Sequence, residues 1–154
     1  MRRHLPATVA AVTATAVVGG LGTDVRSSWY ADLDRPAWEP PTWAFPVAWT
    51  TLYGLIAVAS GRVLDRAPAK ERKAFARALG VNLTLNTAWT WLFFTAKQPR
   101  WALAEILLLQ ASTLDLARRA QHVDPVAHDL LAPYAGWVGF ATVLTASIAR
   151  RNPT

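Results

Sequence analysis

Residues 43–61 read WAFPVAWTTLYGLIAVASG, a stretch of 19 residues without a charged side chain. An α-helix rises about 1.5 Å per residue, so a run of this length crosses a bilayer core of roughly 30 Å. A helix of a soluble bundle would instead show one apolar stripe with charged residues opposite it. The stretch therefore favours a membrane-spanning helix over a helix of a soluble bundle.

Comparable apolar runs lie on both sides of this stretch. The run near residue 110 is weaker because it contains Glu105 and Asp115, and the first run also fits a signal peptide. Pro36, Pro40 and Pro41 exclude a helix just before residue 43. The sequence thus predicts one all-α domain over residues 1–154, an integral membrane bundle of five transmembrane helices at about residues 5–23, 43–61, 76–96, 101–119 and 129–149.

The composition excludes several classes of site. Charged residues make up 17% of the chain, against about 25% in soluble domains. There are no cysteines, which excludes disulfides, zinc–thiolate sites, iron–sulfur clusters and thiol catalysis. The eight tryptophans suit either a membrane–water interface or an aromatic ligand pocket.

The Lys and Arg residues predict the orientation. With five helices, ten of the 16 lie at the N-terminus and in the 62–77 and 118–129 segments, and six lie on the other side. The positive-inside rule then predicts a multi-pass protein of the cell membrane with a cytoplasmic N-terminus and an external C-terminus. We interpret the net charge of +6 as topology and headgroup attraction, with no nucleic acid as partner.

Four aromatic motifs follow one another along the chain. They read RPAWEPP at 35–41, FPVAWTTLY at 45–53, NTAWTWLFF at 86–94 and PYAGW at 133–137. In residue types, order and spacing they resemble the translocator protein family, also called the TspO or peripheral-type benzodiazepine receptor family, in its bacterial-type form. The resemblance covers nearly the whole chain.

This resemblance implies a fold and a function. It implies five helices around an internal ligand pocket, binding of porphyrins such as protoporphyrin IX and haem, of sterols and of synthetic aromatic ligands, and often a homodimer. It also implies that the Pro-rich loop with Trp38 closes the pocket mouth and that Asn86 lies at the pocket floor. We expect a tetrapyrrole-binding protein in porphyrin transport, sensing or disposal. The alternatives are light- and oxygen-dependent porphyrin degradation, with Trp49 and Trp137 as candidate catalytic residues, and a ligand-sensing regulatory protein.

The residues support an inward aromatic face on three helices. Phe45, Trp49 and Tyr53 recur every four residues, and such residues share one helix face. An amide is unfavourable against lipid, so Asn86 should point into the bundle. Ordinary packing, or for Asn86 a bond to a neighbouring helix, is the alternative. The predicted ligand-binding residues are Trp38, Phe45, Trp49, Tyr53, Asn86, Trp89, Phe93, Tyr134, Trp137 and Ala141.

Other residues have weaker functional interpretations. Arg35 can meet a ligand carboxylate or a lipid headgroup equally well. Glu105 is interpreted as lying one turn into its helix, where the helix dipole and headgroup water tolerate a negative charge. Ala76 and Gly80 form a small-xxx-small pair that would suit a dimer contact.

Metal and sterol sites are not expected. The three histidines lie outside the inward helix faces, so no metal, no haem-iron ligand and no required cofactor are predicted. No Ser–His–acid set, phosphate loop or carboxylate pair suggests an enzyme. The last helix lacks the Tyr that the sterol pattern of animal relatives places after Tyr134, and Thr145 replaces the usual Asn, so at most weak sterol binding is expected.

Overall fold

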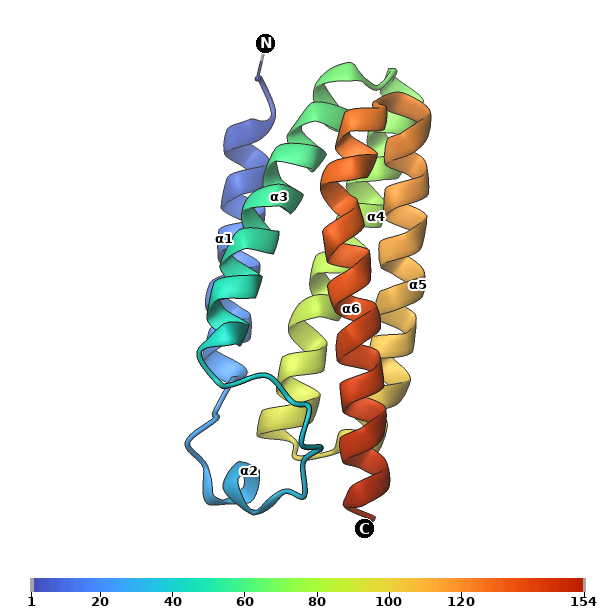
Figure 1. Ribbon diagram of the computed structural model, residues 1–154. Helices are drawn as coiled ribbons and strands as arrows, with labels where there is room; N and C mark the ends of the chain where they lie inside the picture. The colour runs from blue at the N-terminus through green and yellow to red at the C-terminus, as the bar shows by residue number, and fades with distance from the viewer. Residues whose placement is uncertain (1, 154) are drawn as a thin grey trace.

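A computed structural model describes residues 2–153, and the ends of the predicted domain, residues 1 and 154, lie outside them. The described chain is helical with no β-strand, which confirms the all-α prediction. It contains α1 (Leu5–Gly22), α2 (Ser28–Asp32), α3 (Ala44–Arg66), α4 (Ala69–Thr90), the π-helical turn η1 (Trp91–Thr95), α5 (Pro99–Val123) and α6 (Pro125–Arg151) (Figure 1).

The five long helices lie side by side, and the short α2 lies in the loop below them (Figure 1). Around the bundle the neighbours follow the order α1, α3, α6, α5, α4, and α4 closes the ring against α1. The N-terminus and the C-terminus lie at opposite ends (Figure 1). We call the end that holds α2, the 23–43 loop and the C-terminus the loop end, and the opposite end the basic end.

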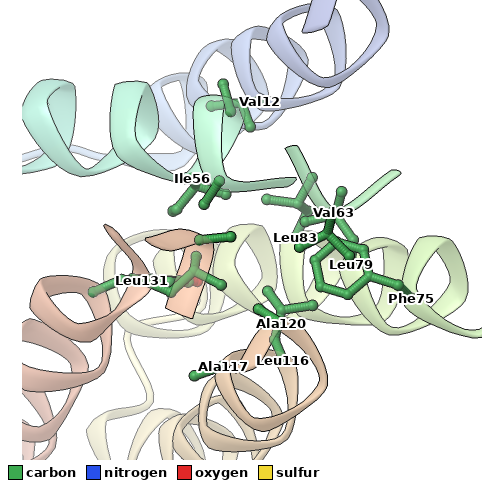
Figure 2. Close-up of a cluster of buried hydrophobic side chains, with 14 of the residues drawn as sticks. Val12, Ile56, Val63, Phe75, Leu79, Leu83, Leu116, Ala117, Ala120 and Leu131 are labelled. Atoms are coloured by element: carbon green, nitrogen blue, oxygen red, sulfur yellow. The ribbon is translucent and has the colours of Figure 1, made fainter. Parts of the chain in front are cut away.

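The larger apolar core cluster lies between the long helices, and a second cluster, with Phe93, Ala102 and Leu144, lies at the loop end. Figure 2 shows Val12 of α1, Ile56 of α3 and Leu131 of α6 pointing towards a layer of side chains from α4 and α5. Ile56, Leu116 and Leu131 have no exposed surface. Each such side chain contributes on the order of 1.5–3 kcal/mol when it is removed from water. Inside a membrane, where the side chains are not removed from water, close packing between helices supplies part of this stabilisation instead.

The predicted connectors at 62–77 and 118–129 are wrong. α3 continues through its charged residues to Arg66, and α4 begins at Ala69, so only Ala67 and Pro68 connect them. Asp124 alone separates α5 from α6. Charged side chains do not break a helix, whereas proline does, because it lacks the N–H and restricts the preceding residue. Pro68 and Pro125 therefore fix these two boundaries.

The third apolar run is divided in the structure. It was expected as one helix at 76–96, but α4 ends at Thr90 and η1 continues to Thr95. The Ala96 N–H donates to the Trp91 carbonyl at 2.8 Å, and Lys97 then adopts a positive φ of 56°. This left-handed residue turns the chain into α5, a position that usually favours glycine.

Helix α1 approaches its neighbours closely through glycines. A Cβ on Gly22 would lie 2.8 Å from the indole of Trp91, and a Cβ on Gly61 would lie 3.3 Å from the Leu5 backbone. The Trp91 indole N–H donates to the Val18 carbonyl at 3.0 Å. These contacts fix α1 against η1 at one end and against α3 at the other.

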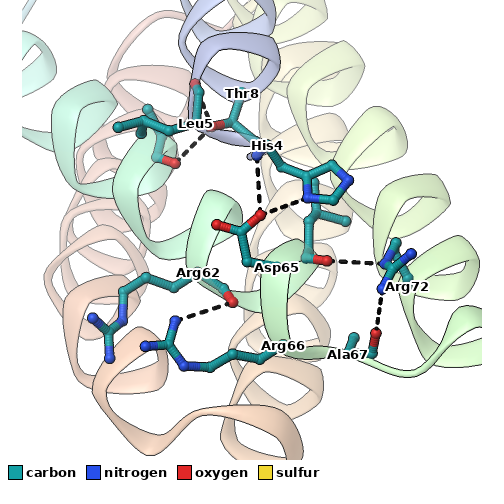
Figure 3. A network of polar contacts seen from close by, with 10 residues as sticks. His4, Leu5, Thr8, Arg62, Asp65, Arg66, Ala67 and Arg72 are labelled. Carbon is teal, nitrogen blue, oxygen red and sulfur yellow. Dashed lines mark hydrogen bonds and ion pairs between the residues drawn. The ribbon is translucent and has the colours of Figure 1, made fainter. Parts of the chain in front are cut away.

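Polar contacts tie the basic end together (Figure 3). The His4 backbone N–H and ring each contact Asp65 Oδ1, at 3.0 and 2.7 Å. Arg72 donates to the carbonyls of Leu64 and Ala67, both at 2.9 Å. These carbonyls lie at the end of α3, where helix carbonyls lack helical partners. Arg72 of α4 therefore caps the end of α3, and the Asp65 side chain of α3 accepts the N–H of His4 at the start of α1.

Asp124 connects α3 to the turn between α5 and α6. Its carboxylate accepts from Arg62 Nε at 2.8 Å and from the Val126 N–H at 3.1 Å, so it also caps α6. Burial favours the neutral acid, but the hydrogen bond and charge of Arg62, together with Val126 and Arg66, hold the pKa of Asp124 below its ordinary value.

Replacing Asp124 by Ala should lower the free energy of unfolding by about 1–3 kcal/mol, because a helix cap and a charge-assisted hydrogen bond are lost. Since the folded-state pKa is lowered, this stabilisation is complete above the ordinary aspartate pKa of about 3.9. It is lost as the pH falls through the lowered value. Unfolding in detergent at neutral and acidic pH measures both effects. Asp115→Ala, in the exposed pair with Arg119, is the control, and equal losses would contradict the assignment.

Three helices are long and apolar enough to cross a membrane, namely α1, α3 and α6. α4 begins in the basic segment, and α5 carries Glu105 and Asp115, so these two are less apolar. Four tryptophans are exposed at the loop end, with Trp43 at 70% and Trp101 at 68% exposure, followed by Trp38 and Trp91. Tryptophan is enriched at membrane–water interfaces, which suits an interface at this end.

Candidate functional site

A chain of side-chain hydrogen bonds crosses the middle of the bundle. The Tyr53 hydroxyl of α3 donates to Asn86 Oδ1 of α4 at 3.0 Å. Asn86 Nδ2 donates to the Tyr134 hydroxyl of α6 at 3.0 Å, and Tyr134 donates to Asn82 Oδ1 at 2.8 Å. Asn82 Nδ2 then reaches Thr113 Oγ1 of α5 at 3.0 Å. One continuous chain therefore joins four helices.

The side chains of this hydrogen-bonded chain are one another's partners. Asn82, Tyr134 and Thr113 are almost fully buried, and Asn86 is 5% exposed. The Thr113 hydroxyl in turn donates to the Leu109 carbonyl at 2.8 Å, so the hydrogen bonds all point in the same direction along the series. Buried polar groups are costly without partners, so this chain fixes the rotations of α3, α4 and α6 relative to one another.

The first aromatic group lies between α3 and α6. Trp49 contacts Tyr53, Tyr134 and Trp137, with ring centroids 5.5, 6.3 and 6.4 Å apart. Phe45 contacts Trp137 at 5.9 Å. The indoles of Trp49 and Trp137 are nearly perpendicular, at 88°. We call Phe45, Trp49, Tyr53, Tyr134 and Trp137 the α3–α6 aromatic group.

The second aromatic group lies where α4 passes into η1. Trp89 stacks on Phe93 at 5.2 Å, and Phe93 meets Phe94 at 4.9 Å. Trp29 of the loop meets the edge of Phe93 at 5.7 Å. We call Trp29, Trp89, Phe93 and Phe94 the α4–η1 aromatic group. The predicted site residues on the helices thus fall into two groups, and Asn86 bonds to two members of the first.

The 23–43 loop covers the loop end. Trp38 is 49% exposed and meets Phe140 of α6 at 5.9 Å, so it touches the first group only through Phe140. The Asp34 N–H donates to Asn152 Oδ1 at 2.9 Å, which ties the loop to the end of α6.

Arg35 has a partner within the loop. It donates to Glu39 Oε2 at 3.1 Å and its guanidinium lies 4.6 Å from the centre of the Tyr30 ring. The Tyr30 hydroxyl donates to the other Glu39 oxygen at 3.0 Å. Burial and then the Glu39 charge raise the pKa of Tyr30 above its ordinary value. A ligand carboxylate would have to displace Glu39 to reach Arg35.

Two open cavities in the described part of the chain lie near these residues. One, of about 500 Å³, is formed by the loop between Leu33 and Thr42. The other, of about 360 Å³, is an apolar groove between α3 and α6 that reaches Trp137 and Phe140. The predicted internal pocket stays a prediction, because the aromatic side chains there pack against one another.

The amino-acid sequence is similar to those of a known protein family. The model of the TspO/MBR family matches residues 7–151. The chain belongs to the TspO/MBR family. The human Translocator protein is 36% identical over 127 residues, which cover 80% of this chain and 75% of that protein. Protein CrtK of Rhodobacter capsulatus is 35% identical over 127 residues, with coverages of 82% and 79%. The Tryptophan-rich sensory protein of Cereibacter sphaeroides is 35% identical over 144 residues, with coverages of 94% and 88%.

The family resemblance that the sequence motifs indicated is therefore confirmed. Family membership and the apolar helices together make the chain a membrane protein. In this TspO/MBR protein, His4 contacts Asp65 and His128 contacts the Ala117 carbonyl, and neither bond involves a member of the aromatic groups. Within residues 2–153, no group of three His, Asp or Glu side chains could hold a metal ion.

The interpretation of Glu105 needs correction. α5 begins at Pro99, so Glu105 lies in its second turn, and the dipole effect falls off within the first. Its side chain is buried, with 8% exposure, and neither carboxylate oxygen has a hydrogen-bond partner. Headgroup water therefore does not account for this residue in the TspO/MBR fold.

Sequence reasoning missed several members of the site. Phe140 meets both Trp137 and Trp38, and it lies one helical turn after Trp137, a spacing that would have indicated it. Thr113 and Trp29 carry no comparable signal, because their contacts are to residues distant in sequence. Ala141 is half-buried and packs against the core, and Thr145 donates to its carbonyl at 2.7 Å.

Proposed function

We propose that this protein binds a flat tetrapyrrole, protoporphyrin IX or haem, between its aromatic groups and acts in porphyrin transport, sensing or disposal. The observation that carries the proposal is the perpendicular pair of Trp49 and Trp137, on two facing helices, joined to the hydrogen-bonded chain at Tyr53 and Tyr134. Aromatic walls with few polar groups suit a flat apolar ring with polar edges.

Unpaired polar atoms support the same proposal. The indole N–H groups of Trp89 and Trp137 are buried and have no hydrogen-bond partner. Buried donors normally have a hydrogen-bond partner, so an acceptor on a ligand would supply the partner that these N–H groups lack. The propionates of a porphyrin are such acceptors. The ring would have to separate side chains that now pack together, and the α3–α6 groove reaches Trp137 from outside.

Titrating the purified protein with protoporphyrin IX should quench tryptophan fluorescence, and the quenching should saturate at a fixed ratio of ligand to protein. Empty micelles of the same detergent control for partitioning. A linear response, matching the micelles, would contradict the proposal. The same titration in light tests the alternative of porphyrin degradation: a change in the pigment spectrum that needs light, oxygen and protein would favour it.

The five-span topology and its orientation are part of the proposal. The basic end carries Arg62, Arg66 and Arg72, and the loop end carries the exposed tryptophans, which favours a cytoplasmic basic end. Because the chain has no cysteine, single cysteines report on each end. Arg26→Cys should react with a membrane-impermeant thiol reagent in intact cells, and Lys70→Cys should react only after lysis. The opposite pattern would reverse the orientation.

We also propose a second copy of this chain as a partner, and sterol as at most a weak ligand. Ala76 and Gly80 both lie on the exposed face of α4, and no side chain covers Gly80, which suits contact with a second copy. Sterol should bind at most weakly, because α6 has no tyrosine after Tyr134.

A further inference from the structure

One buried acid in the described chain lacks a partner. The other buried or half-buried carboxylates are paired: Glu39 with Arg35, Asp65 with His4, Asp115 with Arg119 and Asp124 with Arg62. Glu105 alone among residues 2–153 has two buried carboxylate oxygens with neither an ion pair nor a hydrogen bond. An unpaired buried charge is strongly unfavourable, so this position calls for an explanation.

Glu105 faces the interior of the bundle. It lies on the buried face of α5 together with Ala102, Ile106 and Leu109, and α5 packs between α4 and α6. On the same helix, Gln110 donates to the Ala135 carbonyl of α6 at 3.1 Å, and the neighbouring Tyr134 ring meets Trp49. The part of α5 that carries Glu105 therefore packs beside the part of α6 that contributes to the α3–α6 aromatic group, and no tyrosine or asparagine of the hydrogen-bonded chain donates to the carboxyl group.

The hydrogen-bonded chain explains why Glu105 is left alone. The hydroxyl donors of that chain are already used: Tyr134 donates to Asn82 and Tyr53 donates to Asn86. The two indole N–H groups that remain free, on Trp89 and Trp137, are likewise unpaired and so do not reach Glu105. The interior thus holds a buried carboxyl group that has no hydrogen-bond partner among the described residues and that only a cationic partner would favour in its charged form.

We propose that Glu105 recognises a flat aromatic cation, whose N–H donor pairs with the carboxylate while its ring lies against the α3–α6 aromatic group. Two forces favour this ligand class. The carboxylate gains the partner that a buried charge requires, and tryptophan faces attract cations. The inference rests on the proposed ring-binding walls, and it adds a charge preference that porphyrin binding does not require.

The test uses two fluorescent probes of similar shape. 9-Aminoacridine is a flat three-ring cation with N–H donors, and anthracene has three fused rings without charge or donor. Wild-type protein in detergent should bind 9-aminoacridine at least about tenfold more tightly than anthracene, a difference of about 1.4 kcal/mol. Glu105→Gln should remove that preference and leave anthracene and protoporphyrin IX binding within about twofold. Glu71→Gln, an exposed acid on α4, is the matched control and should change nothing.

The thermal stability of the Glu105 variants shows whether a loss of binding reflects unfolding. Removing a lone buried charge should leave the thermal midpoint unchanged or raised, and Glu105→Met should behave as Glu105→Gln does. The proposal is overturned if wild type does not prefer 9-aminoacridine, if Glu105→Gln keeps the preference, or if both variants unfold or lose all three ligands together. If protoporphyrin IX does not bind but the cation preference remains and depends on Glu105, the proposed function is contradicted and this inference is not.

Discussion

Trp49→Ala and Trp137→Ala should each weaken protoporphyrin IX binding about tenfold. Stacking of a flat ring on an aromatic side chain contributes on the order of 1–3 kcal/mol, and about 1.4 kcal/mol is a factor of ten in affinity. The ring centroids of the two indoles lie 6.4 Å apart on different helices, so a ring lying against the α3–α6 aromatic group would contact both. Tryptophan quenching or porphyrin absorbance in detergent measures the change.

Trp101→Ala is the matched control for this pair. Trp101 is 68% exposed in the first turn of α5, and it makes none of the aromatic contacts of either group that the structure describes. Its loss should leave the affinity almost unchanged. If Trp101→Ala harms binding as much as the other two while all three variants stay folded, the site assignment fails and the aromatic groups are ordinary packing.

The same substitutions separate binding from photochemistry. If light alters the bound pigment, Trp49→Ala and Trp137→Ala should abolish that change, because electron transfer or oxygen chemistry requires the indole close to the ring. The measurement is made at a ligand concentration that saturates each variant, so that a lower affinity does not imitate a slower reaction. A pigment change that persists at full rate would exclude these tryptophans from the chemistry.

Tyr134→Phe should be among the most destabilising single-atom changes in the chain, at about 2–3 kcal/mol. It removes the hydroxyl that accepts from Asn86 and donates to Asn82, and it leaves the Asn86 N–H and the buried Asn82 Oδ1 without these partners. An unsatisfied buried group costs about 1–3 kcal/mol, and hydrogen bonds inside membrane proteins contribute up to about 1.7.

Tyr53→Phe is the internal comparison for Tyr134→Phe. Tyr53 stands at the start of the hydrogen-bonded chain and makes one bond, to Asn86, so its loss should cost about 1 kcal/mol. Thermal or denaturant unfolding in one detergent measures both variants. Equal effects of the two substitutions would show that the chain of hydrogen bonds does not act as the distances suggest.

The apolar patterns predicted much of the architecture. The start of α3 at Ala44 follows from the prolines before it, and the inward faces follow from residues spaced three or four apart. The prediction failed where it used charge to end a helix: α3 runs on to Arg66 and α5 runs on to Val123. In both cases the charged side chains lie in helical turns that project beyond the apolar run, where they can find partners such as Asp124.

The sequence did not predict how the candidate site residues connect to one another. Asn86 was expected to face inward, and it is buried, but nothing local indicated that it joins Tyr53 to Tyr134. The sequence allowed Arg35 to pair with a ligand carboxylate, whereas in the fold it is paired with Glu39.

The sequence by itself determined that the chain is helical, apolar enough for a membrane and aromatic on three helix faces, because these properties depend on spacing within one segment. Only the tertiary structure decided which partner each polar side chain has. Partners come from helices far apart in the chain, and their rotation depends on close contacts such as that of Gly22 with Trp91. For the same reason only the fold reveals Glu105 as unpaired, since a missing partner is a property of all the surrounding helices together.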